Sequence, residues 1–159
     1  DIAIQGPTSM NTCPARFVFV TSDAGKDRLE PALKPPNVAK MRGAPVTAIL
    51  AWDPAYWERL DFLFPHDDRK PLFAKNAAYA HDTAYRNSTL QGGYLMIAAR
   101  ALGLDIGAMS GFSNKIIDEE FFHGTSVKSN FLCNIGYADE TALFQRLPRF
   151  AFDDVCEVV

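Results

Sequence analysis

The chain has 159 residues, of which 48% are hydrophobic and 22% are charged, so we expect one domain that buries a core without a metal or a disulfide. A net charge of −3, with lysines and arginines scattered, argues against a nucleic-acid-binding protein, which needs a basic surface for the phosphates. The three cysteines form no CxxC pair and no apolar run has membrane length, so we expect a reducing, cytoplasmic setting and no membrane contact.

The first residues, Asp1–Gln5, resemble the last turn of a helix that Gly6 and Pro7 bring to an end. We therefore expect that a preceding helical segment is missing, and that residues 1–159 otherwise form one domain. A polar loop, Thr8–Pro14, then leads into Arg16–Thr21, whose β-branched and aromatic residues predict a strand.

Short helices are expected next. Ser22 is placed to cap a helix that runs through Leu33, and Asn37 to cap another turn that ends near Gly43. The apolar run Pro45–Trp52 predicts a central strand. Residues 53–75 look like a long loop, a kind of segment that is usually functional or mobile, and we expect residues 61–75 to border a substrate pocket.

The stretch Asn76–Leu104 predicts one long helix, ended by Gly103 in a left-handed conformation. In its first half, periodicity predicts that Tyr79, Thr83, Arg86 and Leu90 share the packed face. Its second half is apolar all round and must be buried, either in the core or at a subunit contact, and the spacing does not choose between the two.

Two further strands are predicted, over Asp105–Ser110 and Lys128–Tyr137, with Ser113 capping a helix between them. Residues 144–155 read as an extended tail suited to lying across a surface. Helices and strands alternate, but the strands are few, so we predict an α+β fold in which helices cover a small, mostly antiparallel sheet.

No familiar hydrolase, metal or nucleotide motif is present. The histidines at 66, 81 and 123 have no second ligand at metal-binding spacing, and the acidic runs are typical of a solvated face. Ser110 lacks the residues of a nucleophile elbow, and neither a GxGxxG nor a P-loop sequence occurs.

Five segments nevertheless resemble the nitroreductase superfamily of FMN enzymes. The first is Pro7–Phe17, and the other four, which are similar to the malonic semialdehyde reductase branch, are Arg86–Gly92, Ala98–Leu104, Met109–Phe112 and Lys128–Tyr137. The resemblance spans nearly the whole chain, in family order. It implies an intertwined homodimer with the long helix at the subunit contact and two FMN molecules between the protomers.

The resemblance also implies site residues. Ser9 and Asn11 would hydrogen-bond the flavin, and Ala108, Ser110 and Gly111 would run along it, with a peptide N–H near Ser110 meeting N5. Arg149 would hold the FMN phosphate, to which a guanidinium fork is suited. No catalytic side chain and no metal are expected, because the flavin carries the hydride.

The implied reaction passes hydride from NADPH or NADH through the flavin to a small electrophile, first of all malonic semialdehyde, giving 3-hydroxypropanoate. Reduction of nitroaromatics or quinones is the sister possibility. Two other classes of function stay open: a non-catalytic dimer module that cannot retain FMN, and a nucleic-acid or protein adaptor, for which exposed aromatics such as Trp57 are the only sign.

Overall fold

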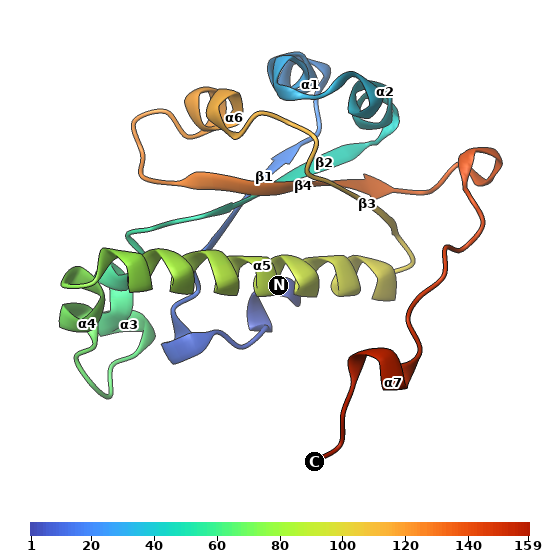
Figure 1. Cartoon of the computed structure of the whole chain (residues 1–159). Helices are drawn as coiled ribbons and strands as arrows, with labels where there is room; N and C mark the ends of the chain where they lie inside the picture. Colours follow the sequence, from blue (N-terminus) through green and yellow to red (C-terminus); the bar gives the residue numbers. More distant parts are fainter.

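A computed structural model describes residues 1–159 and contains one four-stranded sheet in the order β1-β2-β4-β3 (Figure 1). The strands are β1 (Ala15–Val20), β2 (Val46–Trp52), β3 (Asp105–Met109) and β4 (Lys128–Gly136). All neighbouring pairs are antiparallel, with Val18 opposite Ile49 and Ile49 opposite Leu132 across the centre. The predicted strands and the α+β class are confirmed.

One face of the sheet is covered by α1 (Asp23–Leu29), α2 (Pro35–Gly43) and α6 (Asn114–Phe121), with a 3₁₀ turn η3 (Glu30–Ala32) after α1. Ser22 and Ser113 cap α1 and α6 as predicted, because each side chain accepts from a peptide N–H three residues on. The core of this layer is a cluster of 11 buried apolar residues, among them Leu29, Met41 and Leu132.

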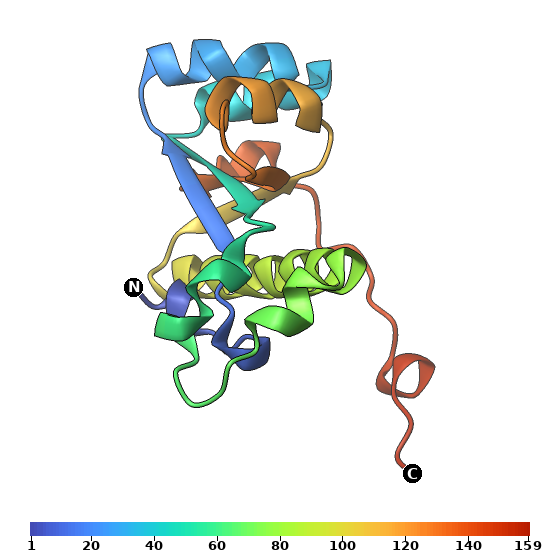
Figure 2. The ribbon, with the colours of Figure 1, turned by 90° about the vertical axis from the view of Figure 1, so that its left-hand side faces the viewer.

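The opposite face is covered by the single helix α5 (Ala77–Ala101), which lies along the sheet in both ribbon views (Figures 1 and 2). Gly103 has φ +80° and the Leu104 N–H donates to Ala99 O, which is the predicted helix ending. The predicted packed face is wrong except for Thr83, since Tyr79, Arg86 and Leu90 are exposed. Small and polar residues are buried instead: Ala80, Thr83, Ala84, Asn87, Ser88, Gln91 and Gly92.

The second half of α5 is only partly covered in the single chain. Ile97 and Leu102 are 68% and 70% exposed, although sequence alone required this half to be buried. Ala98 and Ala99, by contrast, are buried against the body. The sequence left two explanations for this apolar half, burial in the core or at a subunit contact. Core packing accounts for only one side of it.

The segment between β2 and α5 is more ordered than the predicted loop. It contains η4 (Tyr56–Arg59), α3 (Leu60–Leu63) and α4 (Lys70–Ala74). Tyr56, Leu60 and Phe73 are buried there against Ala80 and Ala84 of α5. This subdomain gives the N-terminal half of α5 a core of its own.

The two ends of the chain differ. Turns η1 (Ala3–Gln5) and η2 (Ser9–Asn11) lie against α5, whereas the tail beyond β4 leaves the body and contains only η5 (Glu140–Ala142) and α7 (Phe152–Val155). Every residue from 139 to 159 is exposed. No helix of the fold combines the length and apolar character that crossing a bilayer requires.

Candidate functional site

The loop that carries Ser9 and Asn11 has an uncommon backbone. Met10, Asn11 and Cys13 have φ of 50°, 51° and 41°, in the left-handed region that non-glycine residues seldom adopt. Such conformations cluster at functional sites, and the surrounding structure has to maintain them. Ser9 and Asn11 are both exposed, so their hydroxyl and amide groups can reach a ligand.

Hydrogen bonds fix the position of this loop. Within it, the Asn11 N–H donates to Thr8 O at 3.0 Å and the Cys13 N–H to Thr8 Oγ1 at 3.1 Å. Asn11 Nδ2 also donates to Leu63 O at 2.8 Å, which ties the loop to the segment between β2 and α5. That segment, which sequence suggested as a pocket border, therefore contacts a candidate site residue directly.

Ala108, Ser110 and Gly111 lie at the end of β3, an edge strand of the sheet. Ala108 and Ser110 are exposed, and Gly111 is half-buried. Among the hydrogen bonds of the chain, none has the peptide N–H of Ser110 or Gly111 as its donor, and neither residue belongs to a helix or strand. Two adjacent peptide donors are therefore available to an acceptor outside the chain.

The turn at Gly111 is held from α2. Gly111 O accepts from the Lys34 N–H at 2.9 Å and from Asn37 Nδ2 at 3.1 Å. A Cβ on Gly111 would lie 2.7 Å from Asn37 Nδ2 and 3.5 Å from Lys34 Cδ, so the turn closely approaches both side chains. Sequence reasoning missed these two residues.

Asn37 was predicted to cap a helix, and that prediction is wrong. The helix begins at Pro35, with Lys34 in the cap position, and Asn37 sits inside the first turn with its side chain on Gly111. The Pro35-Pro36 pair was the available signal, because proline is favoured at the first helical position.

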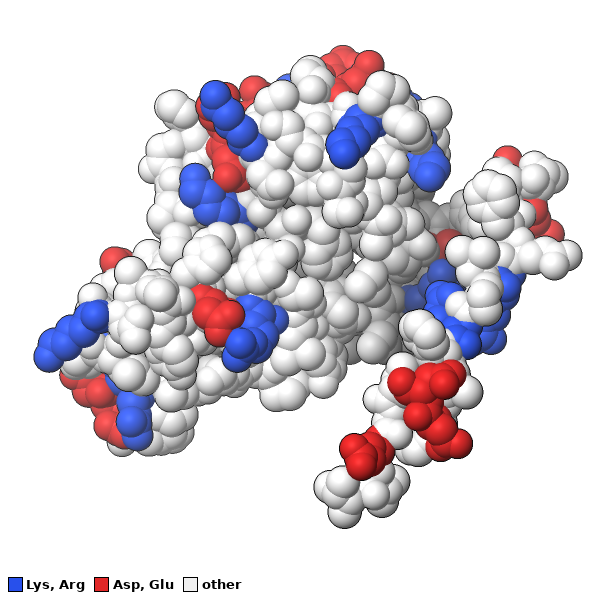
Figure 3. Space-filling model, in the orientation of Figure 1, with Lys and Arg blue, Asp and Glu red and all other residues white.

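Arg149 is on the exposed tail, where its guanidinium donates only to Leu147 O and Pro148 O of its own turn. Figure 3 shows basic atoms on the middle of the tail and acidic atoms toward its end. The fork of the guanidinium that would grip a phosphate has no acidic partner among the ion pairs of the chain.

One chain does not bring the predicted residues together. Ser9 and Asn11 lie on the far side of α5 from the sheet, the Ser110–Gly111 turn contacts α2 on the other face, and the tail projects away (Figures 1 and 2). Two surface cavities, of about 340 and 450 Å³, are lined by none of the predicted site residues. The candidate site is therefore three separate pieces in one protomer.

The 450 Å³ hollow is almost entirely apolar and opens on the second half of α5, between Ile2, Leu95, Leu102 and Ile135. The smaller one is polar and lies in the segment before α5, around Asp61, Asp67 and Lys70. The Lys70 ammonium pairs with Asp61 and holds the pKa of that carboxyl below its usual range.

Ionisable groups give no alternative centre of chemistry. Burial raises the pKa of the Cys133 thiol to about 11, so this buried thiol is a poor nucleophile at neutral pH. Burial likewise raises the pKa of Tyr56. No group of three or more His, Cys, Asp or Glu side chains is placed to hold a metal ion.

Comparison with known proteins gives a consistent result. The sequence model described as "Nitroreductase family" matches residues 1–137. A Burkholderia lata protein named NADH dehydrogenase/NAD(P)H nitroreductase is 54% identical over 158 residues, which cover 99% of this chain and 81% of that protein.

Solved structures share the fold. A nitroreductase from Exiguobacterium sibiricum in complex with FMN superposes with a TM-score of 0.86 at 24% identity, covering 99% of this chain and 82% of the other. An NAD(P)H:FMN oxidoreductase from Staphylococcus epidermidis gives a TM-score of 0.86 at 22% identity, covering 99% and 81%.

Proposed function

The chain belongs to the nitroreductase family, and from that premise we propose that it is an NAD(P)H-dependent flavin oxidoreductase. Its cofactor is FMN, its hydride donor is NADPH or NADH, and its acceptor is a small electrophile. The observation that carries the proposal is the pair of unused peptide donors at Ser110 and Gly111, on the exposed end of β3.

The residues present fit FMN. Peptide N–H groups and small side chains suit close approach to the edge of a flat ring, and Ser9 and Asn11 supply uncharged donors and acceptors. Arg149 supplies a guanidinium for the phosphate. When bound, FMN supplies hydride transfer at N5, which explains why the chain needs no nucleophile of its own.

We propose a homodimer, which the separation of these pieces supports. A flavin that touches both the Ser9 loop and the Ser110 turn has to lie between two protomers, because α5 and the sheet separate the two in one chain. The exposed apolar residues of α5 and of the tail, such as Ile97, Phe144 and Phe150, give each copy a surface to bury against the other.

For the acceptor we propose malonic semialdehyde, reduced to 3-hydroxypropanoate. The support is the likeness of Arg86–Gly92 and Lys128–Tyr137 to that branch, together with the charge beside the turn. Lys34 is exposed, lies next to Gly111 and has no acidic partner, so its ammonium can meet the carboxylate of such a substrate. Nitroaromatic or quinone reduction is the second candidate, favoured by the name of the Burkholderia relative.

The decisive experiment is a visible spectrum of the purified protein with FMN, before and after anaerobic NADPH and NADH. Retained flavin that bleaches supports the proposal. A chain that retains no flavin contradicts it and leaves a non-catalytic dimer module.

Acceptors are then compared in wild type and in Lys34→Met. We expect this variant to raise KM for malonic semialdehyde by about two- to fivefold, the size of one exposed ion pair, and to leave KM for a neutral nitroaromatic unchanged. Equal changes for both acceptors would argue against a role of Lys34 in recognising the carboxylate.

A further inference from the structure

The segment Arg86–Gly92 contributes to the resemblance, yet the proposed function gives its polar residues no task. Two of them, Asn87 and Gln91, are amides buried to 6% and 3% exposure on a helix whose neighbours include alanine and glycine. Burying an amide is unfavourable unless it is hydrogen-bonded, so the partners of these side chains indicate what they do.

Both amides bond to the strained loop. Asn87 Oδ1 accepts from the Ser9 N–H at 2.8 Å, and Gln91 Oε1 accepts from the Ala15 N–H at 3.0 Å. These two peptide groups bracket the residues with positive φ, Met10, Asn11 and Cys13. The two acceptors are one helical turn apart, so a single face of α5 holds both ends of the loop.

The orientation of the Asn87 amide is fixed by a second bond. Its Nδ2 donates to Thr83 O at 2.8 Å, so its oxygen has to point at Ser9. The helix itself is held firmly in place. A Cβ on the adjacent Gly92 would lie 2.6 Å from Leu50 Cδ2 and 2.7 Å from Phe131 Cζ, so α5 packs on the sheet at the closest approach that glycine allows.

We propose that Asn87 and Gln91 are positioning residues for flavin binding: they hold the loop Thr8–Pro14 in the left-handed conformation that presents Ser9 and Asn11 to FMN. The inference rests on the proposed function for the identity of the ligand. The loop geometry itself does not depend on that function, because the hydrogen bonds form within the chain.

The test uses two variants of similar side-chain size that lack the acceptor, Asn87→Leu and Gln91→Met. Ser88→Ala is the matched control, since Ser88 is buried on the same helix and bonds to Tyr85 O and Asn130 rather than to the loop. Gln91→Glu, which keeps an acceptor oxygen, serves as the rescue variant, and all variants are compared with it at about pH 5, where burial keeps an unpaired carboxyl neutral.

Two readouts are needed. In the protein without flavin, we expect hydrogen exchange at Ser9 in Asn87→Leu and at Ala15 in Gln91→Met to accelerate about tenfold, with Ser88→Ala within twofold of wild type. With FMN added, the dissociation constant should rise about tenfold in both variants and return toward the wild-type value in Gln91→Glu.

Loop exchange that matches the Ser88→Ala control, or a loosened loop that binds FMN as wild type does, overturns the inference while the proposed function stands. A wild-type chain that binds no FMN overturns the proposed function and, with it, the role of the two amides toward flavin. If Asn87→Leu fails to fold, Gln91→Met and Gln91→Glu decide the question.

Discussion

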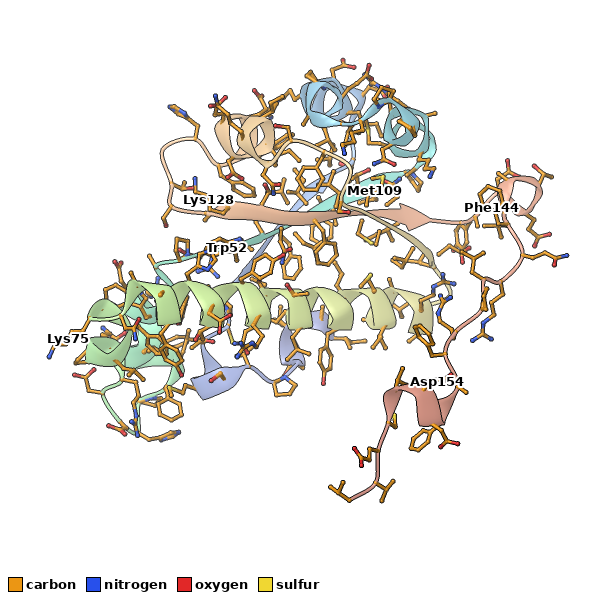
Figure 4. The ribbon with its side chains drawn as sticks, viewed as in Figure 1. Trp52, Lys75, Met109, Lys128, Phe144 and Asp154 are labelled. Atoms are coloured by element: carbon orange, nitrogen blue, oxygen red, sulfur yellow. The ribbon has the colours of Figure 1, made fainter.

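The two faces of the sheet are covered by different kinds of buried side chain. Toward α1, α2 and α6, the sheet presents Val20, Ile49 and Leu132 to a closed apolar core. Toward α5, the sheet contributes Ala48, Leu50 and Cys133 to a smaller apolar cluster. The helix α5 buries mainly small and polar side chains, and its outer side leaves Ile97 and Leu102 exposed. In Figure 4, side chains fill the space on both sides of the sheet, and the labelled Trp52 lies on the side that faces α5.

This difference suggests that one face mainly stabilises the fold and that the other mainly serves ligand binding and assembly. The first face is a hydrophobic core that would serve any α+β protein, because burial of apolar area is its main source of free energy. The second face carries the strained loop, the two amides and the surface proposed for the partner. Stability should therefore respond most to changes on the first face, and assembly and ligand binding to changes on the second.

The largest loss of stability is expected for Leu132→Ala. Leu132 is fully buried in β4, so truncation leaves a cavity in the apolar core and should lower the free energy of unfolding by about 3 kcal/mol. Leu72→Ala, at a position 41% exposed in α4, is the control and should cost less than about 1 kcal/mol. Urea unfolding followed by circular dichroism measures both, and similar losses would contradict the ranking.

The next largest effect concerns assembly. Ile97→Glu places a charge on the uncovered side of α5, and we expect it to weaken the proposed homodimer about a hundredfold, because a carboxylate would have to be desolvated at the contact. Ala39→Glu adds the same charge at an exposed position of α2 and should leave the dimer intact. Analytical ultracentrifugation of both variants measures the monomer–dimer equilibrium. If the Ile97→Glu protein is as dimeric as wild type, the subunit contact does not involve this side of α5.

A smaller effect is expected for Gly92→Ala. The added methyl group meets Leu50 and Phe131, and overpacking outweighs the better helix propensity of alanine, for a net loss of about 1 to 2 kcal/mol. Gly43→Ala, where a Cβ meets nothing within 4 Å, should be neutral or slightly stabilising. If Gly92→Ala were as stable as wild type, α5 would not be packed as closely as this face requires.

The sequence predicted the first face better than the second. β-branched strands and the caps Ser22, Ser113 and Gly103 follow local rules, and they were confirmed. The packed face of α5 was not predictable by the same means. Hydrophobic periodicity selects Tyr79 and Leu90, whereas the structure buries Asn87 and Gln91 because a loop more than seventy residues away supplies their partners.

The candidate site shows the same limit. Resemblance gives Ser9, Asn11, Ala108, Ser110, Gly111 and Arg149, and these roles remain predictions. Nothing local in the sequence indicates that α5 and the sheet lie between them, or that Asn37 turns from the predicted cap toward Gly111. Spatial relations of this kind depend on strand order, which spacing along the chain does not encode.

The smallest expected effect tests whether the α5 face excludes water. Cys133 lies there beside Ala48 and Leu50, and burial raises the pKa of its thiol from 9.0 to about 11. Well below pH 9.0 the thiol is protonated in both states and does not make stability depend on pH. As the pH rises from 9.0 toward 11, the unfolded thiol ionises first, so unfolding becomes more favourable.

Cys133→Ala should therefore show a shallower loss of stability with alkaline pH than wild type, and the difference between the two proteins isolates this thiol from the lysines and tyrosines. Iodoacetamide at mildly alkaline pH should label the exposed Cys156 in the folded protein, and Cys133 only after unfolding. Labelling of Cys133 at the same rate as Cys156 would mean that water reaches the sheet beneath α5. The cluster of Ala48, Leu50 and Cys133 would then not be closed between the sheet and α5, and the packing described for this face would be wrong.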